Sequence, residues 1–173
     1  MATAYLGLGS NKGGRINFIQ NAVIEIEKIF STSVVKASSV YETEPWGFSD
    51  QDDYLNCAVE INTKLIAEVL LKELKNIEIK LGRQDNKKWS EREIDIDLLF
   101  FEYQIIRSVN MNVPHPQLEH RKFVLIPLNE IAPDLNHPVL NKNISELLKE
   151  CRDELYVRKY EMNEKEIYVS GRQ

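Results

Sequence analysis

The stretch EREIDIDLLFFE (residues 91–102) joins an apolar run, typical of a buried β-strand, to two carboxylates near its start. Side chains alternate across a strand, so Ile94, Ile96 and Leu98 are expected to point into a core and Asp95 and Asp97 away from it. The two aspartates would then lie side by side, with Cα atoms roughly 6.5–7 Å apart. This stretch predicts a sheet with one covered face and a pair of acids on the other.

The pattern upstream alternates between strand-like and helix-like segments. The predicted strands cover residues 3–9, 33–42, 54–63 and 94–101, and the predicted helices cover 15–30 and 66–81. The first helix has an apolar face that runs from Ile19 to Phe30, and Gly82 is a natural stop for the second. The order strand, helix, strand, strand, helix, strand is that of an α+β, ferredoxin-like βαββαβ core. We expect an antiparallel sheet with both helices on one face, leaving the other face free as a working surface.

Beyond residue 102 the pattern is less regular. Residues 113–121 are predicted to be a loop, 123–131 a short apolar helix or strand, and 144–151 a helix. We find no internal repeat and no linker, so we predict a single domain over 1–173. Its core would span about 3–140, with C-terminal additions over about 141–173.

The overall composition is that of a globular protein that has no excess of basic residues. The 173 residues are 43% hydrophobic and 28% charged, with a net charge of -5. This argues against a protein whose main role is to bind nucleic acid. Cys57 and Cys151 have no metal-ligand spacing and are expected to be reduced thiols. No signal peptide and no apolar run of ~18 residues is found, so we expect a cytoplasmic protein without membrane association.

Two adjacent carboxylates repel each other unless water screens them or a cation lies between them. Oxygen ligands of this kind suit Mg²⁺, which takes one or two protein carboxylates and completes its shell with water and substrate phosphates. The loop before the strand holds four bases, namely Arg83, Lys87, Lys88 and Arg92, offset by several acids. Two interpretations stay open here: a solvated strand edge with a solvated loop, or a metal-assisted phosphoryl-transfer site.

The glycine-rich segment GLGSNKGG (7–14) is not a phosphate-binding loop. It lacks the GK[ST] ending of a P-loop, and Lys12 stands where a dinucleotide-binding fingerprint needs its last glycine. We interpret it as a tight turn from strand to helix.

Several segments together resemble one enzyme family. The run KWSEREIDIDLL (88–99) resembles the signature of the 6-hydroxymethyl-7,8-dihydropterin pyrophosphokinases of folate biosynthesis. Five further segments are similar to family segments in family order: YLGLGSN (5–11), YETEPWG (41–47), DYLNCAVEI (53–61), LGR (81–83) and VPHPQLEHRKFVLIPLNEIAPDL (113–135). The resemblance implies a ferredoxin-like fold. It also implies transfer of pyrophosphate from ATP to the hydroxymethyl group of the dihydropterin, with release of AMP.

The resemblance also implies a role for individual residues. Asp95 and Asp97 would hold two Mg²⁺ ions, and with Arg83 and Arg92 they would be the catalytic residues. The implied ATP-binding residues are Glu78, Arg83, Trp89, Arg92, Leu98, His115 and Arg121. The implied pterin-binding residues are Thr43, Pro45, Trp46, Tyr54, Asn56 and Phe123, and the turn at 7–14 is expected to border the pterin site. This chain departs from the family pattern at Lys75, Ser90 and Asn110.

Two other functions stay open on the sequence alone. The same element order serves RNA-binding modules, although the strand YLNCAVEI lacks their aromatic motif. A catalytically silent, nucleotide-binding relative would carry the same residues. The expected partners are ATP and the dihydropterin, with no nucleic acid and no membrane, and we expect a monomer.

Overall fold

The computed structural model describes residues 1–45, 51–83 and 92–161. In chain order the elements are β1 (Ala2–Ser10), α1 (Arg15–Glu27), β2 (Thr32–Ala37), β3 (Tyr41–Thr43), β4 (Tyr54–Thr63), α2 (Ala67–Lys80), β5 (Asp95–Phe101), β6 (Ile106–Arg107), β7 (Asn112–Val113), a 3-10 turn (Leu118–His120), α3 (Lys122–Ile131), α4 (Ile144–Glu150) and β8 (Val157–Lys159).

The central sheet is antiparallel and has the strand order β5-β1-β4-β3-β8, with β2 also paired to β4. The predicted α+β class and antiparallel sheet are confirmed, and β4 coincides with the predicted strand 54–63. Gly82 follows α2 with a φ of 102°, as expected for a helix stop. The hairpin of β6 and β7 and the C-terminal strand β8 were not predicted.

The sequence prediction fails at two places before β4. The predicted strand 33–42 is two strands, β2 and β3, because the Ser38 side chain accepts a hydrogen bond from Ala58 N–H and interrupts the ladder. The first helix ends at Glu27, where Lys28 N–H already bonds back three residues to Glu25. Phe30 therefore lies beyond the helix and is 84% exposed, not buried as the periodicity predicted.

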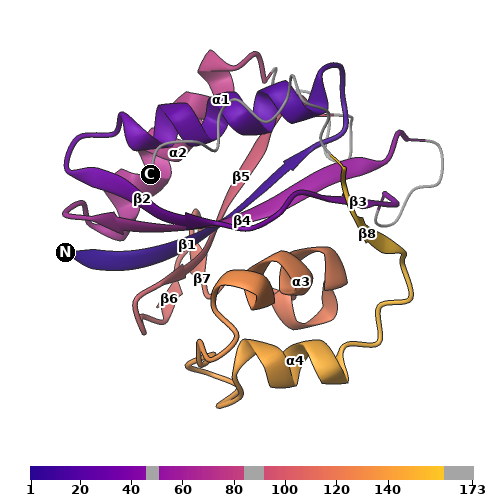
Figure 1. Ribbon diagram of the computed structural model, residues 1–173. Helices are drawn as coiled ribbons and strands as arrows, with labels where there is room; N and C mark the ends of the chain where they lie inside the picture. The colour runs from indigo at the N-terminus through magenta and orange to yellow at the C-terminus, as the bar shows by residue number, and fades with distance from the viewer. Residues whose placement is uncertain (46–50, 84–91, 162–173) are drawn as a thin grey trace.

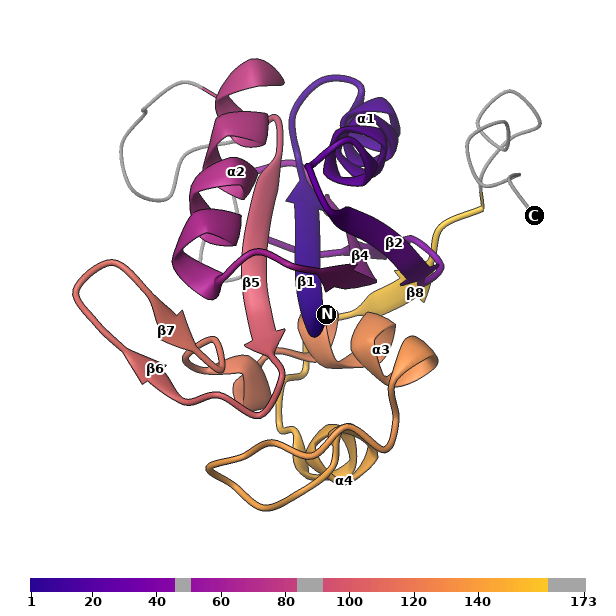
Figure 2. The same ribbon diagram turned by 90° about the vertical axis from the view of Figure 1, so that its left-hand side faces the viewer.

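The two predicted helices lie on one face of the sheet, as expected, but two further helices cover part of the other face, so the prediction that this face is left free is wrong. Figures 1 and 2 show α1 and α2 on one side and α3 and α4 on the other. The core under α1 and α2 includes Leu6, Leu8, Ile26, Ile61, Leu74 and Ile96. A second core lies under α3 and includes Ala58, Leu99, Phe100, Leu125 and Leu128. The working surface is therefore the part of the second face that α3 leaves uncovered.

A β-bulge in β5 determines which side chains reach each core. Leu6 pairs with Leu98 and Tyr5 with Phe100, so Leu99 is an extra residue on β5. Leu98 packs under α1 and α2, whereas Leu99 and Phe100 both pack under α3. The simple alternation therefore ends at Phe100, beyond both aspartates, which keep the orientation that the sequence predicted.

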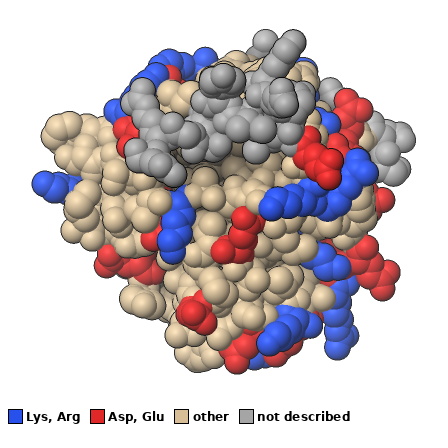
Figure 3. All heavy atoms as spheres, viewed as in Figure 1, with Lys and Arg blue, Asp and Glu red and all other residues tan. Residues whose placement is uncertain are grey.

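None of the helices in the described ranges combines the length and the apolar character needed to cross a membrane. The face drawn in Figure 3 carries basic and acidic side chains interspersed, rather than one continuous basic surface.

Candidate active site

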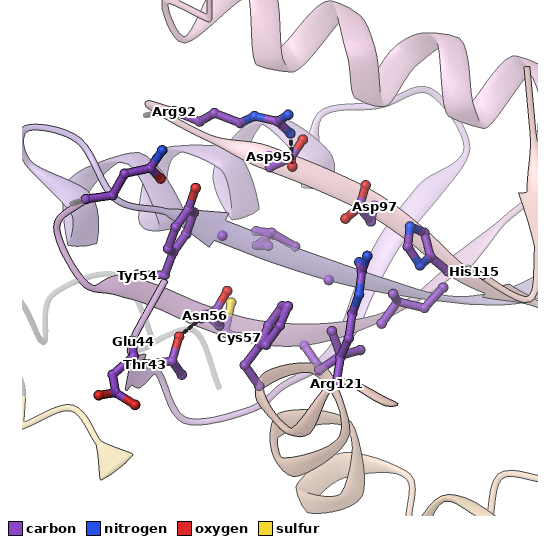
Figure 4. Close-up of a pocket in the computed structure, with 18 residues that line it drawn as sticks. Thr43, Glu44, Tyr54, Asn56, Cys57, Arg92, Asp95, Asp97, His115 and Arg121 are labelled. Atoms are coloured by element: carbon purple, nitrogen blue, oxygen red, sulfur yellow. Dashed lines mark hydrogen bonds and ion pairs between the residues drawn. The ribbon is translucent and has the colours of Figure 1, made fainter. Parts of the chain in front are cut away.

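A cavity of about 440 Å³ opens on the face of the sheet that α3 only partly covers. Its lining comes from β5, β1, β4, β3 and the start of α3 (Figure 4). Nine predicted site residues line it: Thr43, Tyr54, Asn56, Arg92, Asp95, Asp97, His115, Arg121 and Phe123. These residues are far apart in sequence, and the strand order brings them together.

The floor of the cavity is made by two glycines of β1. Gly7 pairs with Asp97 on one side and Ala58 on the other, and Gly9 pairs with Asp95 and Asn56. A Cβ on Gly9 would lie only 2.9 Å from Asn56 Oδ1. The absence of side chains at these positions separates the two aspartates from the residues of β4 by an open strip. The glycine-rich segment thus contributes the floor as well as the predicted turn.

Asp95 is held by two arginines. Its Oδ1 lies 2.8 Å from Arg83 Nη1 and its Oδ2 2.5 Å from Arg92 Nη1. Burial acts to raise the pKa of Asp95, but the charges of Arg92, Lys75 and Arg83 outweigh it and lower the pKa. Asp95 is therefore an ionised carboxylate whose charge the protein already balances.

Asp97 lies in a different electrostatic environment on the same strand. Burial and the neighbouring Asp95 carboxylate raise the pKa of Asp97, and His115 and Arg121 oppose that rise only in part. Figure 4 shows Asp97 between Asp95 and His115, with the guanidinium of Arg121 reaching toward it from the α3 side. Burial also lowers the pKa of His115, so this imidazole is neutral near pH 7. The strip around Asp97 therefore favours an additional positive charge.

The strand that carries both aspartates is fixed from behind by α2. Glu78 accepts a hydrogen bond from Ile96 N–H at 2.6 Å, and Lys75 Nζ lies 3.3 Å from Ile96 O. Glu78 is 1% exposed and also contacts Lys75 and Arg83. Lys75, which departs from the family pattern, thus helps to position the peptide between the aspartates.

The opposite wall of the cavity is built for a planar polar ligand. Asn56 Nδ2 donates to Thr43 Oγ1 at 2.8 Å, which fixes the orientation of the amide (Figure 4). The rings of Tyr54 and Phe123 line the same wall. An amide between two aromatic rings can bind the edge of a heterocycle while the rings contact its faces.

The remaining predicted residues are not in the lining. Leu98 is 4% exposed in the core under α1 and α2, and Glu78 and Arg83 lie behind Asp95. Pro45 is exposed to an intermediate degree beside the cavity, and Asn110 lies in the turn between β6 and β7. Trp46, Trp89 and Ser90 lie outside the described residues. Nine further lining residues were not among the predicted site residues: Gly7, Leu8, Gly9, Glu44, Gln51, Cys57, Ala58, Leu99 and Val124.

A family model described as 7,8-dihydro-6-hydroxymethylpterin-pyrophosphokinase (HPPK) matches residues 5–133. This chain belongs to the HPPK family. It is a hydroxymethyldihydropterin pyrophosphokinase of folate biosynthesis, as the resemblance implied. The RNA-binding alternative is thereby set aside.

Relatives of similar length agree with the HPPK assignment. A 2-amino-4-hydroxy-6-hydroxymethyldihydropteridine pyrophosphokinase of Aquifex aeolicus is 43% identical over 150 residues, which are 87% of this chain and 92% of the relative. The enzyme of the same description from Haemophilus influenzae is 37% identical over 158 residues, covering 91% of this chain and 98% of the relative.

Among solved structures, HPPK-DHPS of Plasmodium falciparum with pteroate superposes with a TM-score of 0.71 at 18% identity. The alignment covers 86% of this chain and 42% of that one, so this chain spans less than half the length of HPPK-DHPS. At this identity the likeness concerns the fold alone.

The donor set of this HPPK fits a magnesium ion that is shared with substrate. In the part of the chain that the structure describes, no group of three or more His, Cys, Asp and Glu could enclose a metal ion. Asp95 and Asp97 supply two carboxylates, which is the number that Mg²⁺ takes when phosphates complete its shell. Burial and the Asp95 charge raise the pKa of Asp97 despite the opposing charges around it, and a divalent cation bound there would offset that rise.

Proposed function

We propose that this pocket transfers the β,γ-pyrophosphoryl group of ATP to the hydroxymethyl oxygen of 6-hydroxymethyl-7,8-dihydropterin. The oxygen forms a bond to the β-phosphorus, the bond from that phosphorus to the α,β-bridging oxygen breaks, and AMP leaves. The hydroxyl proton passes to solvent. The observation that carries the proposal is the open glycine strip, with a carboxylate pair on one side and an aromatic and amide wall on the other.

Asp95 and Asp97 would hold two Mg²⁺ ions, which would neutralise phosphate oxygens as charge develops in the transfer. Arg92 and Arg121 line the cavity and would bind further phosphate oxygens, bidentately where the geometry allows. Arg83 would join them from its place behind Asp95. Asp95 already accepts from Arg83 and Arg92, so phosphates of the nucleotide would compete for these guanidinium groups and release the carboxylate toward the cation.

The dihydropterin would lie between Tyr54 and Phe123 with its polar edge on Asn56. Stacking of this kind contributes on the order of 0.5–1.5 kcal/mol per aromatic pair. The Thr43 hydroxyl holds the Asn56 amide in one orientation, which favours a ligand edge with matching donors and acceptors. Trp46 and Pro45 would contribute to the same wall, and Glu78, Trp89 and His115 to the ATP side.

In a ferredoxin-like core, the fourth, first, third and second strands lie side by side. Counting β2 and β3 as one split strand, the order β5-β1-β4-β3 supports this classification. We further propose that residues 1–173 act as one domain, as a monomer and in the cytoplasm. Pairing of β3 with β8 supports the single domain.

The decisive assay incubates the protein with ATP, Mg²⁺ and 6-hydroxymethyl-7,8-dihydropterin and identifies the nucleotide product. AMP, formed in equal amount to the pterin diphosphate, is the expected result. ADP as the product would contradict pyrophosphoryl transfer, and a complete lack of turnover would instead favour a silent relative.

A further inference from the structure

We propose that residues 153–159, the C-terminal strap, position both walls of the pterin side of the pocket, and that Asp153 and Arg158 are its positioning residues. The strap lies outside the segment that the HPPK family model matches, which ends at residue 133. The inference rests on the proposed function, because it takes this wall as the pterin site.

The first attachment holds the start of α3. The first N–H groups of a helix have no partner within the helix, and Arg121 at the N-cap provides no side-chain cap here. Asp153 supplies one instead, since its Oδ2 accepts from Lys122 N–H at 2.9 Å. Its other oxygen accepts from Leu155 N–H at 3.0 Å, which fixes the carboxylate. The capped Lys122 lies between Arg121 and Phe123, both of which line the cavity.

The second attachment holds β3. Within β8, Val157 pairs with Thr43 and Arg158 with Glu42, while Tyr156 N–H donates to Glu44 Oε2 at 3.1 Å. Thr43 and Glu44 both line the cavity. Figure 1 shows the chain running from the end of α4 past one end of α3 to β8, which lies beside β3. One short segment therefore reaches both the β3 wall and the α3 wall.

The third attachment is an ion pair network beneath β3. Glu42 is 7% exposed, and its two oxygens contact Arg15 on one side and Arg158 on the other. Arg15 also donates to Asp53 O at 2.6 Å, immediately before Tyr54. The network thus extends from the strap to the start of β4, whose first three residues include Tyr54 and Asn56. Arg158 is 64% exposed, so we expect its contribution to be smaller than that of Asp153.

Replacing charged side chains of the strap by uncharged ones of similar size tests its role without removing the segment. In Asp153→Asn only one oxygen is left to accept two N–H groups, so one hydrogen bond is lost with almost no change in shape. The matched control is Glu154→Gln, which removes the same charge from the exposed neighbour. The double variant Asp153→Asn with Arg158→Gln has its own control, Glu154→Gln with Arg152→Gln. This control also removes one acidic and one basic charge, from two exposed residues of the same part of the chain.

The measured quantities are the Kd of the dihydropterin, with a nonhydrolysable ATP analogue and Mg²⁺ present, and the Kd of the analogue itself. Loss of one hydrogen bond should raise the pterin Kd about fivefold, and the double variant about tenfold. The analogue Kd should stay within about twofold, as should both constants in the controls. An unchanged pterin Kd in the double variant would overturn the proposal, and so would an equal rise in both constants, which would indicate general loosening.

Amide exchange separates failure of the strap from failure of the proposed function. Exchange at Lys122 N–H should be faster in Asp153→Asn than in Glu154→Gln, whatever the protein catalyses. If the wild-type protein forms no AMP, the proposed function fails while this readout still tests the first attachment. Equal exchange in the two variants would refute that attachment.

Discussion

Glu78 on α2 accepts a hydrogen bond from the N–H of Ile96, the residue between the two aspartates of β5. Among the strands that the structure describes, β5 is the outermost, so this N–H has no strand partner there on its outer side, and Glu78 takes the place of one. Lys75 contacts the carbonyl of the same residue. The pair of aspartates that we propose to bind metal is thus aligned by two side chains that do not themselves line the cavity.

Glu78→Ala should therefore damage both stability and turnover. It leaves Ile96 N–H unsatisfied and Lys75 and Arg83 without their buried partner, which should lower the free energy of unfolding by about 3 kcal/mol. Turnover should fall at least tenfold because Asp95 and Asp97 lose their alignment. Urea unfolding and AMP formation measure the two effects. Glu78→Gln, which keeps an acceptor for Ile96, should lose less of each, and an Ala variant with wild-type values would refute this role.

Replacement of each aspartate by asparagine should affect stability in opposite directions. Burial and Asp95 raise the pKa of Asp97, so its ionised form costs stability near neutral pH, and Asp97→Asn should unfold at an equal or higher urea concentration. Arginines lower the pKa of Asp95, so its charge contributes stability, and Asp95→Asn should lose about 1 kcal/mol. Both variants should lose turnover by about 10²-fold or more. Equal destabilisation by the two changes would contradict the different charge environments assigned to the two aspartates. Near-normal activity of Asp97→Asn would contradict its proposed role in turnover.

Gly9→Ala should weaken pterin binding selectively. The added Cβ would lie 2.9 Å from Asn56 Oδ1, so the amide that is expected to bind the pterin must shift. We expect the pterin Kd to rise about tenfold, equivalent to ~1.4 kcal/mol, with a nearly unchanged Kd for the ATP analogue. Gly7→Ala is the matched control, since its Cβ would meet only Leu99 side-chain atoms at 3.4 Å. Similar effects of the two substitutions would argue against a specific clash at Asn56.

His137 should make the fold sensitive to mild acid. Its Nδ1 accepts from the N–H groups of Val139 and Leu140, and its ring packs edge-on against Phe100. Burial lowers the pKa of His137 relative to its unfolded value of about 6.5. As the pH is lowered through that value, the unfolded chain binds more protons than the native one, so the free energy of unfolding decreases. Urea unfolding at pH 7.5 and 5.5 should show a smaller loss in His137→Gln than in the wild type. The same pH dependence in both would exclude His137 as its source.

The sequence was most informative where a pattern was both local and regular. Strict alternation from Tyr54 to Thr63 predicted β4 and the face that Asn56 presents, and the same rule placed Asp95 and Asp97 together. The rule fails at Phe100, which packs on the same face as Leu99, because four consecutive apolar residues carry no signal for a bulge. The position of Leu98 in the core under α1 and α2 follows from the strand alternation, but the resemblance had assigned that residue to ATP.

Features that depend on distant contacts were not predictable from local pattern. The apolar segment that forms α3 was left open as helix or strand, and nothing in its periodicity says that it packs on the second face of the sheet. The strand β8 is only three residues long and depends on pairing with β3. Gly7 and Gly9 were interpreted through the turn that follows them, whereas their place between β5 and β4 becomes visible only from the strand order.

The most direct test of the central claim is a crystal structure of the protein with a nonhydrolysable ATP analogue and Mn²⁺, whose anomalous scattering locates the metal. The account predicts two anomalous peaks within coordination distance of the Asp95 and Asp97 carboxylates, each also contacting phosphate oxygens. Peaks elsewhere, with Asp95 still paired to Arg83 and Arg92 and Asp97 facing only solvent, would contradict it.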